Sequence, residues 1–499
     1  MTRLNDEVEG LGPGFGTAAP SRPSNREQPP LRRPWRVLAV TSAAVFMSFL
    51  DVTIVNIAFP DLRRYFGDSS LATLSWVING YGVVFAAALV PAGRLADRIG
   101  RRRLFRVGLT GFVMVSALCA LAPTAELLVA ARCLQALAAA MLVPTSLALL
   151  LPEFPLERRA TATAIWGATG AVAAATGPAL GGLLVAAADW RLIFVVNVPI
   201  GLGALVASRG VLAERRDPRQ TASPDWWGAG LLAVGVAALA LGIVQGPPWG
   251  WRSVEVTVSF GVAVLALGVF LRRCARHPAP VIDLGLFRIR SFAVANVGTV
   301  VFAIGFYALL LCNVLFLTGV WGWDIALAGI ALTPGAVMAA LLAPLAGRAA
   351  DRFGQRAVAV PGALLFAGGA GYLALNATAA PDYVVDLLPG MLLTGSGIGL
   401  CISSFGSAAV AELPPSRFAT GSAITACFRQ IGAVVGIAVL LVVIAAPAPG
   451  DDPTGPFRTA WWVMVGTGLV SVGCALALGR VRAGERTLPP RPSAAGPDR

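Results

Sequence analysis

The sequence predicts an all-α polytopic membrane protein. Hydrophobic residues make up 56% of the 499 residues and charged residues only 13%, and the mean hydropathy is +0.74. This balance differs strongly from that of a soluble domain. Apolar runs recur along the chain, each with the 18 or more residues needed to cross a hydrocarbon core of about 30 Å. A charged loop between two runs is repeated later in the chain, which indicates duplicated halves.

The apolar runs predict fourteen transmembrane helices. We expect them at roughly 36–58, 74–95, 104–122, 126–151, 161–187, 191–208, 227–246, 254–271, 293–318, 326–346, 357–376, 383–410, 420–446 and 458–479. The expected organisation is a disordered cytoplasmic tail over 1–34, a six-helix half over 35–210, a linker with two extra helices over 211–291, a second six-helix half over 292–480, and a second disordered tail over 481–499. Both tails are rich in Pro and Arg and lack an apolar core, and we expect no signal peptide.

The repeated loop joins the second and third helices of each half. Gly93–Arg102 and Gly347–Arg356 are identical at seven of ten positions and lie 254 residues apart. A charged, glycine-containing loop repeated between hydrophobic helices predicts a secondary transporter with two equivalent halves. The loop residues to which we assign a gating role are Gly93, Asp97, Arg98, Gly100, Arg101 and Arg102 in the first copy, and Gly347, Asp351, Arg352, Gly354 and Arg356 in the second.

The distribution of arginine predicts the orientation. All 39 positively charged residues are Arg. With fourteen helices, 32 of them fall in the termini and the loops on one side, five lie on the other side, and two, Arg132 and Arg429, lie inside helices. By the positive-inside rule, both termini and both repeated loops are cytoplasmic. The net charge of +13 then comes from arginines at the cytoplasmic edge of the membrane, so we expect no nucleic-acid partner.

Several classes of chemistry lack the residues that they need. Without Lys, no P-loop exists, because its Lys must reach the nucleotide phosphates. The single histidine, His277, lies in an Arg-rich loop and cannot supply a zinc site or a catalytic triad. The seven cysteines are isolated, which is typical of buried apolar residues. We therefore expect no enzyme, metal or cofactor, and energy must come from an ion gradient.

Four ordered motifs carry a family resemblance. They are Leu50–Pro60 in the first helix, Ala131–Ala136 in the fourth, Ala173–Gly182 in the fifth, and Trp190–Gly201 entering the sixth. Together with the repeated loop, they make the chain resemble the major facilitator superfamily, and within it the fourteen-helix drug:proton antiporter group, over about residues 36–480. Three residues depart from the usual pattern, Phe59 in place of Leu, and Ala136 and Ala173 in place of Gly. The two Ala residues each add a methyl group at a close helix contact.

The resemblance implies a fold and an activity. The fold is a twelve-helix core of two six-helix halves, with two inserted helices between them. The activity is proton-coupled export of lipophilic drugs or other small organic compounds, by a monomer in the cell membrane and with protons as the coupling ion. Two alternatives stay open, export of one endogenous metabolite and a non-transporting receptor or scaffold. The fifth-helix antiporter motif includes Gly177, Pro178, Gly181 and Gly182, where the proline either bends the helix during transport or is a packing kink.

Asp51 is the strongest candidate for proton coupling. It is the only acid deep within an apolar run, where a carboxylate is costly unless it is paired, protonated or hydrated. It lies about 10 Å from the outer end of its helix, and Arg132 lies about 9 Å from the outer end of the fourth helix, at about 1.5 Å per residue. We therefore expect an Asp51–Arg132 pair that a proton switches. The alternative is a structural Asp that bonds backbone or keeps a permanent Arg partner.

Other polar residues inside the helices are candidates for the cavity or the gates. Arg429 and Gln430 lie near mid-helix. We expect them either to bind an anionic or carbonyl-bearing substrate or to bond backbone carbonyls that lack a helical partner in the nearby glycine-rich run. Asp97 and Asp351 end helices that run toward the cytoplasm, where an acid opposes the helix dipole and needs a partner such as a loop Arg. We therefore favour a latch, whose contacts break and re-form as the halves move, over a role in orientation alone. The remaining candidates for the cavity are Asn56, Trp76, Asn79, Tyr81, Gln135, Trp166, Asn197, Asn296, Tyr307 and Asn313.

Overall fold

The computed structural model describes residues 32–214, 223–413, 417–445 and 452–478, and these ranges are almost entirely helical. Within these ranges, fourteen helices are long and apolar enough to cross a membrane, which confirms the predicted fold class. Most of the two expected tails lies outside the described residues. The first helix begins at Arg32, so residues 32–34 belong to a helix and the expected boundary of the N-terminal tail was wrong there.

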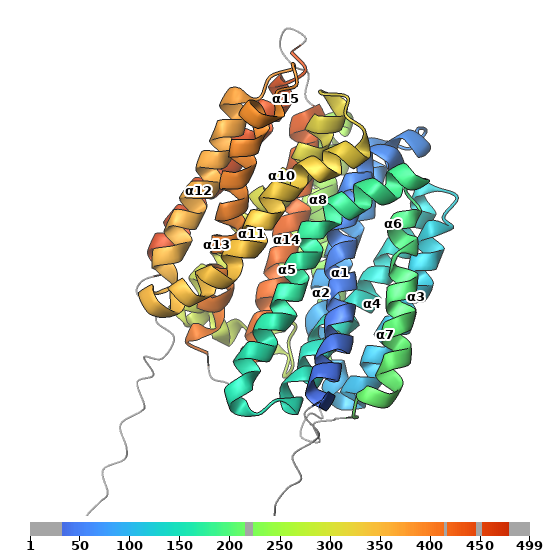
Figure 1. The fold of residues 1–499 in the computed structure, drawn as a ribbon, viewed down its shortest axis with the longest axis vertical. Helices are drawn as coiled ribbons and strands as arrows, with labels where there is room; N and C mark the ends of the chain where they lie inside the picture. Colours follow the sequence, from blue (N-terminus) through green and yellow to red (C-terminus); the bar gives the residue numbers. More distant parts are fainter. Residues whose placement is uncertain (1–31, 215–222, 414–416, 446–451, 479–499) are drawn as a thin grey trace, which may run out of the picture.

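The first half of the bundle contains seven helical segments and one short 3-10 turn (Figure 1). They are α1 (Arg32–Tyr65), α2 (Leu71–Ile99), α3 (Arg101–Ala120), α4 (Ala125–Leu150), η1 (Leu151–Glu153), α5 (Leu156–Ala187), α6 (Leu192–Val195) and α7 (Asn197–Val211). The sixth membrane span runs over Leu192–Val211, as expected. Its segments α6 and α7 meet at Val196, whose backbone angles are helical. Helix α5 runs as one helix through Pro178.

The second half repeats the arrangement after the inserted helices α8 (Trp226–Trp249) and α9 (Val254–Arg276). Its elements are η2 (Leu284–Arg288), α10 (Arg290–Gly319), α11 (Ile325–Phe353), α12 (Gln355–Asn376), η3 (Tyr383–Leu387), α13 (Leu388–Ala411), α14 (Phe418–Ala445) and α15 (Gly455–Ala477). A turn of π-helix, η3, precedes α13.

Local chemistry explains where the helices start, and the two halves share it. Ser70 accepts a hydrogen bond from the Thr73 N–H at the start of α2, and Asp324 accepts one from the Leu327 N–H at the start of α11. Such N-caps satisfy a backbone donor that has no partner inside the helix. The repeated loops also share a turn, because Gly100 and Gly354 have φ angles of 115° and 88°, a region that favours glycine.

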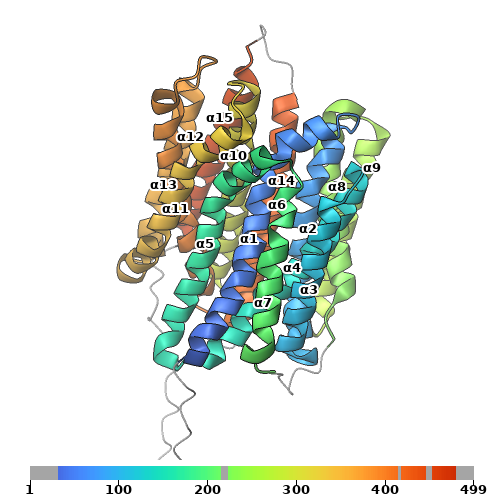
Figure 2. The ribbon, with the colours of Figure 1, turned by 45° about the vertical axis from the view of Figure 1, so that its right-hand side comes forward.

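The two halves meet mainly along two pairs of helices, α5 with α11 and α2 with α14, and α1 makes smaller contacts with α10 and α11. We call the end of the bundle that carries Gly100 and Gly354 the loop end. The α5–α11 contact lies near the other end, where an added Cβ on Gly182 would come within 2.5 Å of the Ile325 carbonyl oxygen. Toward the loop end the two helices separate (Figures 1 and 2), and Gly347 has no neighbour within 4 Å of an added Cβ. The halves are therefore closed at the end opposite the loop end.

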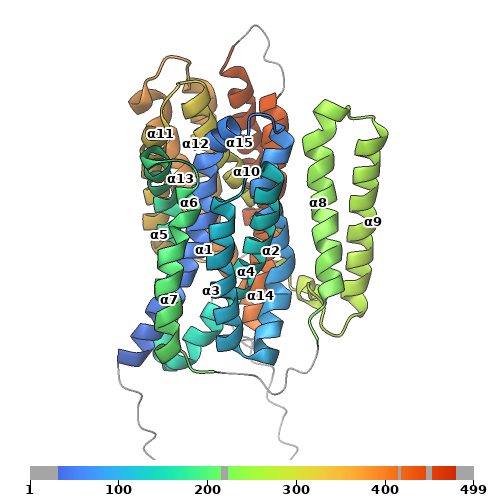
Figure 3. The ribbon, with the colours of Figure 1, turned by 90° about the vertical axis from the view of Figure 1, so that its right-hand side faces the viewer.

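The inserted helices form a hairpin on the outside of the bundle (Figure 3). Helix α8 packs on α2 and α14, and α9 packs on α8. Asp225 caps α8 through the Gly228 N–H, and its buried carboxylate pairs with Arg273 of α9 at 2.6 Å. Large apolar side chains on α9, including Val264 and Leu265, are exposed, as expected for a helix that faces lipid.

Candidate functional site

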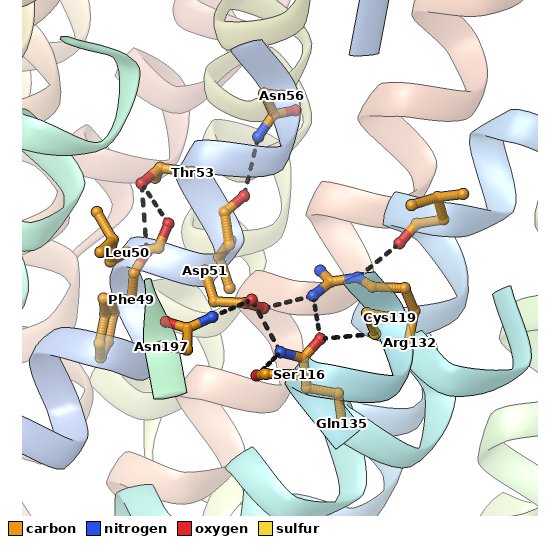
Figure 4. Close-up of polar contacts among 12 residues, drawn as sticks. Phe49, Leu50, Asp51, Thr53, Asn56, Ser116, Cys119, Arg132, Gln135 and Asn197 are labelled. Carbon is orange, nitrogen blue, oxygen red and sulfur yellow. Dashed lines mark hydrogen bonds and ion pairs between the residues drawn. The ribbon is translucent and has the colours of Figure 1, made fainter. Parts of the chain in front are cut away.

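An ion pair lies deep in the first half. Arg132 Nη1 of α4 is 2.5 Å from Asp51 Oδ2 of α1 (Figure 4). The Asp51 side chain is 0% exposed and the Arg132 side chain is 1% exposed. Arg132 Nε also donates to the Val77 carbonyl of α2 at 3.1 Å. The pair therefore links three helices of one half and is shielded from water, and the two residues lie together as the depth argument expects.

Two amide side chains complete the shell of the carboxylate. Asp51 Oδ1 accepts hydrogen bonds from Gln135 Nε2 at 3.0 Å and from Asn197 Nδ2 at 3.1 Å. The Gln135 carbonyl oxygen accepts from Arg132 at 2.6 Å, and Gln135 Nε2 also donates to Ser116 Oγ of α3 at 2.8 Å. Among the described residues, the side chains that contact the Asp51 oxygens are all hydrogen-bond donors.

The network changes the interpretation of two residues. Gln135 and Asn197 were expected in the cavity, but the structure places both against Asp51, inside the first half. Ser116 belongs to the same network, and the sequence analysis did not single it out. A serine in an apolar helix carries no signal by itself, since it can bond its own backbone. Only its contact with Gln135 reveals its role.

Tyr81 of α2 packs against the ion pair. The Arg132 guanidinium lies 4.2 Å from the centre of the Tyr81 ring, a cation–π contact. The Tyr81 hydroxyl is buried and has no hydrogen-bond partner in the described part of the chain. Its electrostatic neighbours are Asp51, Arg132 and Tyr307 of α10. Tyr81 therefore lies against the ion pair, within electrostatic range of a polar residue of the other half.

The polar residues of the second half include the second intramembrane cation. The Tyr307 hydroxyl donates to Gln430 Oε1 of α14 at 3.3 Å and also contacts the Arg429 guanidinium. Within the described residues, Arg429 forms no ion pair. The two halves thus present different polar groups, a compensated ion pair in the first and an uncompensated guanidinium in the second.

Most of the other candidates for the cavity bond within their own half. Asn56 donates to the Val52 carbonyl and Asn296 to the Phe292 carbonyl. Trp166 donates to Ser146 Oγ, and Asn313 accepts from Trp461 Nε1 at 3.1 Å. Trp76 is half-buried, and the amide of Asn79 is buried without a partner among the described residues. The structure therefore brings only part of the predicted set together.

The first repeated loop is held inside its own half. Arg101 Nη2 pairs with Asp97 at 2.8 Å, and Arg101 Nη1 donates to the Ala148 carbonyl of α4 at 3.1 Å. Glu214 accepts from the backbone N–H groups of Arg102 and Arg103 at the start of α3. In the second copy, the side chain of Asp351 lies outside the described part. Of the partners expected for Asp97, Arg101 is the one in contact.

The fifth-helix motif packs against both halves. An added Cβ on Gly177 would meet the Thr53 hydroxyl of α1, and one on Gly181 would meet Ile54 and Ile57. On the other face, the Pro178 carbonyl lies against Gly329 of α11. The motif therefore allows α5 to approach α1 on one side and α11 on the other, where small residues let backbones come close.

Together, the fold and the site define a class of protein. The structure is a bundle of two membrane-embedded halves around a contact surface, with a buried ion pair beside that surface. In the described residues, no group of three or more His, Cys, Asp or Glu side chains is placed to hold a metal ion. These are the features of a secondary transporter that carries small molecules across a membrane.

The chain belongs to the Major Facilitator Superfamily, whose model matches residues 41–271 and 295–497. It is 36% identical over 414 residues to the multidrug resistance protein Stp of Mycobacterium tuberculosis, covering 82% of this chain and 75% of the relative. The tetracenomycin C resistance and export protein of Streptomyces glaucescens is 33% identical, with 83% and 76% covered. The methylenomycin A resistance protein of Bacillus subtilis is 32% identical, with 89% and 92% covered. The protein is thus a multi-pass membrane transporter, and its family is not one of enzymes.

Solved structures of other transporters share the fold. The crystal structure of a human organic anion transporter has a TM-score of 0.62 and 14% identity, and the alignment covers 89% of this chain and 99% of that chain. A bacterial homolog of the lysosomal transporter Spinster, in an inward-facing and unoccupied conformation, has a TM-score of 0.59 and 17% identity, with 91% and 98% covered. At these identities, the likeness concerns the fold alone.

Proposed function

We propose that the protein exports lipophilic drugs or other small organic compounds across the cell membrane in exchange for protons. The observation that carries the proposal is the Asp51–Arg132 pair, the site where one proton changes the charge of the membrane interior. Three relatives named for drug or antibiotic resistance support the substrate class. The arginine distribution supports a cytoplasmic position for both termini and for the loop end. The present conformation, open toward the loop end, is then inward-facing.

The proton acts through the hydrogen bonds around Asp51. A proton on Asp51 removes the charge that holds Arg132 at 2.5 Å and weakens the donor contacts from Gln135 and Asn197. Arg132 then needs other acceptors, so α1 and α4 change their relative position. Binding of substrate favours the conformation with ionised Asp51, and proton binding favours the other. This mutual exclusion is what couples the two fluxes in opposite directions.

Gating involves the contacts between the halves. In the outward-facing state, the α5–α11 contact at Gly182 and Gly329 opens and the loop end closes. The Asp97–Arg101 pair lies at that end, where closing brings the two repeated loops together. We assign these loops the latch role, in which Asp97 exchanges Arg101 for a partner in the other half. The protein works as a monomer, because each chain contains both halves and the ion pair.

A second candidate function is export of one dedicated compound. Two of the relatives carry names that refer to a single antibiotic, tetracenomycin C or methylenomycin A. A protein with this function would transport one chemotype under the same proton gradient. A receptor on a transporter fold would bind a compound tightly and transport none.

The test is transport by purified protein in liposomes under an imposed pH gradient, screened with a panel of lipophilic compounds. The native protein is expected to accumulate compound on the acidic side, while Asp51→Asn falls to the level of empty liposomes, because the amide cannot exchange a proton. Asp61→Asn is the matched control, since Asp61 lies in the same helix but at its end, paired with Arg64. Accumulation against the gradient by Asp51→Asn contradicts the proposal.

A further inference from the structure

A group of hydrogen-bond donors lies at the contact between the halves. Arg429 is the tenth residue of the span that begins at Thr420, which places it about 14 Å along the helix at 1.5 Å per residue. This depth is near the middle of a core of about 30 Å. Arg429 is partly exposed and forms no ion pair with any described residue. An uncompensated guanidinium at this depth is costly unless it lines a cavity or binds a ligand.

The neighbours of Arg429 leave donors free and acceptors occupied. The Tyr307 hydroxyl donates to the carbonyl oxygen of Gln430, and its oxygen contacts the Arg429 guanidinium. The side-chain oxygen atoms of Tyr307 and Gln430 are therefore already used as hydrogen-bond acceptors. The Arg429 guanidinium carries five N–H donors and no acceptor, and among the described residues no hydrogen bond is formed by the Gln430 amide nitrogen. In the first half, the Tyr81 hydroxyl is buried and unpartnered among the described residues, and Tyr307 is among its electrostatic neighbours.

We infer that Arg429, Gln430 and Tyr81 bind the carbonyl groups of neutral aromatic compounds, such as quinones and aromatic ketones, with the Tyr307 ring beside them, and that this site rejects cations. The inference rests on the proposed function and specifies its substrate class. Free N–H and O–H donors match carbonyl oxygens, which only accept. The two tyrosine rings provide flat apolar surfaces for an aromatic ring system.

The charges of the membrane interior oppose a cationic ligand. Arg132 and Arg429 are the two intramembrane cations, and Asp51 is the only deep acid. Asp51 is already bonded to Arg132, Gln135 and Asn197. A cation beside Arg429 would meet an uncompensated like charge in a medium of low dielectric constant, where repulsion is strong.

The direction of coupling opposes an anionic ligand. An anion bound at Arg429 would make the nearby field more negative and would strengthen proton binding at Asp51. Anion and proton would then bind together and travel in the same direction. Antiport requires that they exclude each other, and a neutral carbonyl compound adds no charge that favours joint binding. Because the Tyr81 ring stacks on Arg132, a ligand at its hydroxyl is one side chain away from the ion pair.

The first test compares three tricyclic probes in equilibrium dialysis against the purified full-length protein in detergent. Xanthone carries a carbonyl group, xanthene has the same ring shape without it, and acridine orange is a cation. Xanthone is expected to bind at least about tenfold more tightly than xanthene, the gain from one hydrogen bond to a charged donor. Equal binding of xanthone and xanthene, or tighter binding of acridine orange than of xanthone, overturns the inference.

The second test changes the donors one at a time. Arg429→Gln should weaken xanthone binding about tenfold, leave xanthene unchanged and improve acridine orange, whereas Arg429→Lys should retain the discrimination against the cation. Arg458→Gln is the matched control, because Arg458 is half-exposed and paired with Asp452. Tyr81→Phe should also weaken xanthone binding. Its control is Tyr372→Phe, which loses a hydroxyl bonded to the Val385 carbonyl.

The outcomes separate this inference from the proposed function. Unchanged xanthone affinity in Arg429→Gln, with the variant still monodisperse, overturns the inference. Acridine orange transport that is driven by the pH gradient and lost in Asp51→Asn also overturns it, while leaving the antiporter intact. Arg429-dependent binding of xanthone without any transport driven by the pH gradient supports the binding site and contradicts proton antiport.

Discussion

The two halves share a scaffold but differ at the position of the buried acid. The repeated loops lie 254 residues apart, as do the helix caps Ser70 and Asp324. The residue that lies 254 positions after Asp51 is Gly305, and an added Cβ there would meet Thr467 and, at 3.1 Å, Phe366. No carboxylate fits at that position. The duplication therefore preserves the elements that support a common motion, while the ion pair belongs to one half.

The halves also differ in how their helices are held together. In the first half, side chains bridge helices, as when Arg132 bonds the Val77 carbonyl. In the second half, glycines bring backbones together. An added Cβ on Gly399 would lie 2.5 Å from the Ala339 carbonyl oxygen, and one on Gly432 would lie 2.5 Å from the Val300 carbonyl oxygen. The first half thus contains a buried ion pair, whereas the described part of the second half contains none and has several very close glycine–backbone contacts.

The largest effect is expected from breaking the ion pair. Arg132→Met leaves a buried carboxylate without its cation and should lower the free energy of unfolding by about 3–5 kcal/mol. The loss should shrink in acid, because a proton on Asp51 removes the unpaired charge. Thermal unfolding of the purified protein in detergent at neutral and acidic pH measures both effects.

A double variant tests whether the pair itself is responsible. Asp51→Asn combined with Arg132→Met removes both charges and should recover much of the stability that Arg132→Met loses. If the double variant is no more stable than Arg132→Met, unpaired charge is not the cause. Equal stability of Arg132→Met and the native protein would mean that the pair makes no net contribution.

A smaller loss of stability is expected when an added methyl group overpacks a helix contact in the second half. In Gly395→Ala, the new methyl group would meet the Gly335 carbonyl of α11, and overpacking of this kind costs about 1–3 kcal/mol. Gly368→Ala is the matched control, since nothing lies within 4 Å of its added Cβ. The same thermal unfolding assay compares the two variants. A control variant as unstable as Gly395→Ala would indicate that glycine flexibility, and not close packing, is required.

The smallest loss of stability is expected from a substitution in the inserted hairpin of α8 and α9. Asp225→Ala removes both the cap on Gly228 and the contact with Arg273, with an expected loss of about 1–2 kcal/mol that is confined to the start of α8. Asp225→Asn keeps a capping acceptor and should lose less. Hydrogen exchange of α8 measures the local loss, and transport should persist. Abolished transport with normal exchange would give the hairpin a direct role in the cycle.

The sequence predicted most of the architecture, because each membrane span must satisfy its backbone internally and therefore appears as a long apolar helix. It also predicted that Asp51 and Arg132 lie at similar depth, since helix rise converts position into depth. The start of α1 at Arg32 depends on local contacts and was not predicted.

The composition of the site was only partly predictable. Polar residues in apolar helices indicate a possible role, but their partners depend on how the helices rotate about their axes. Gln135 and Asn197 therefore face Asp51, Asn313 faces Trp461, and Ser116 joins the network without any signal in the sequence. The hydropathy pattern does not determine this rotation.

The central claim is that Asp51 in the first half carries the coupled proton. The most direct measurement is proton release from purified protein in weakly buffered detergent solution, when a compound shown to be transported is added. The native protein should release protons, with saturation at the concentrations that saturate binding. Asp51→Asn should bind the compound and release none. Undiminished release by Asp51→Asn, or binding without release by the native protein, would contradict the claim.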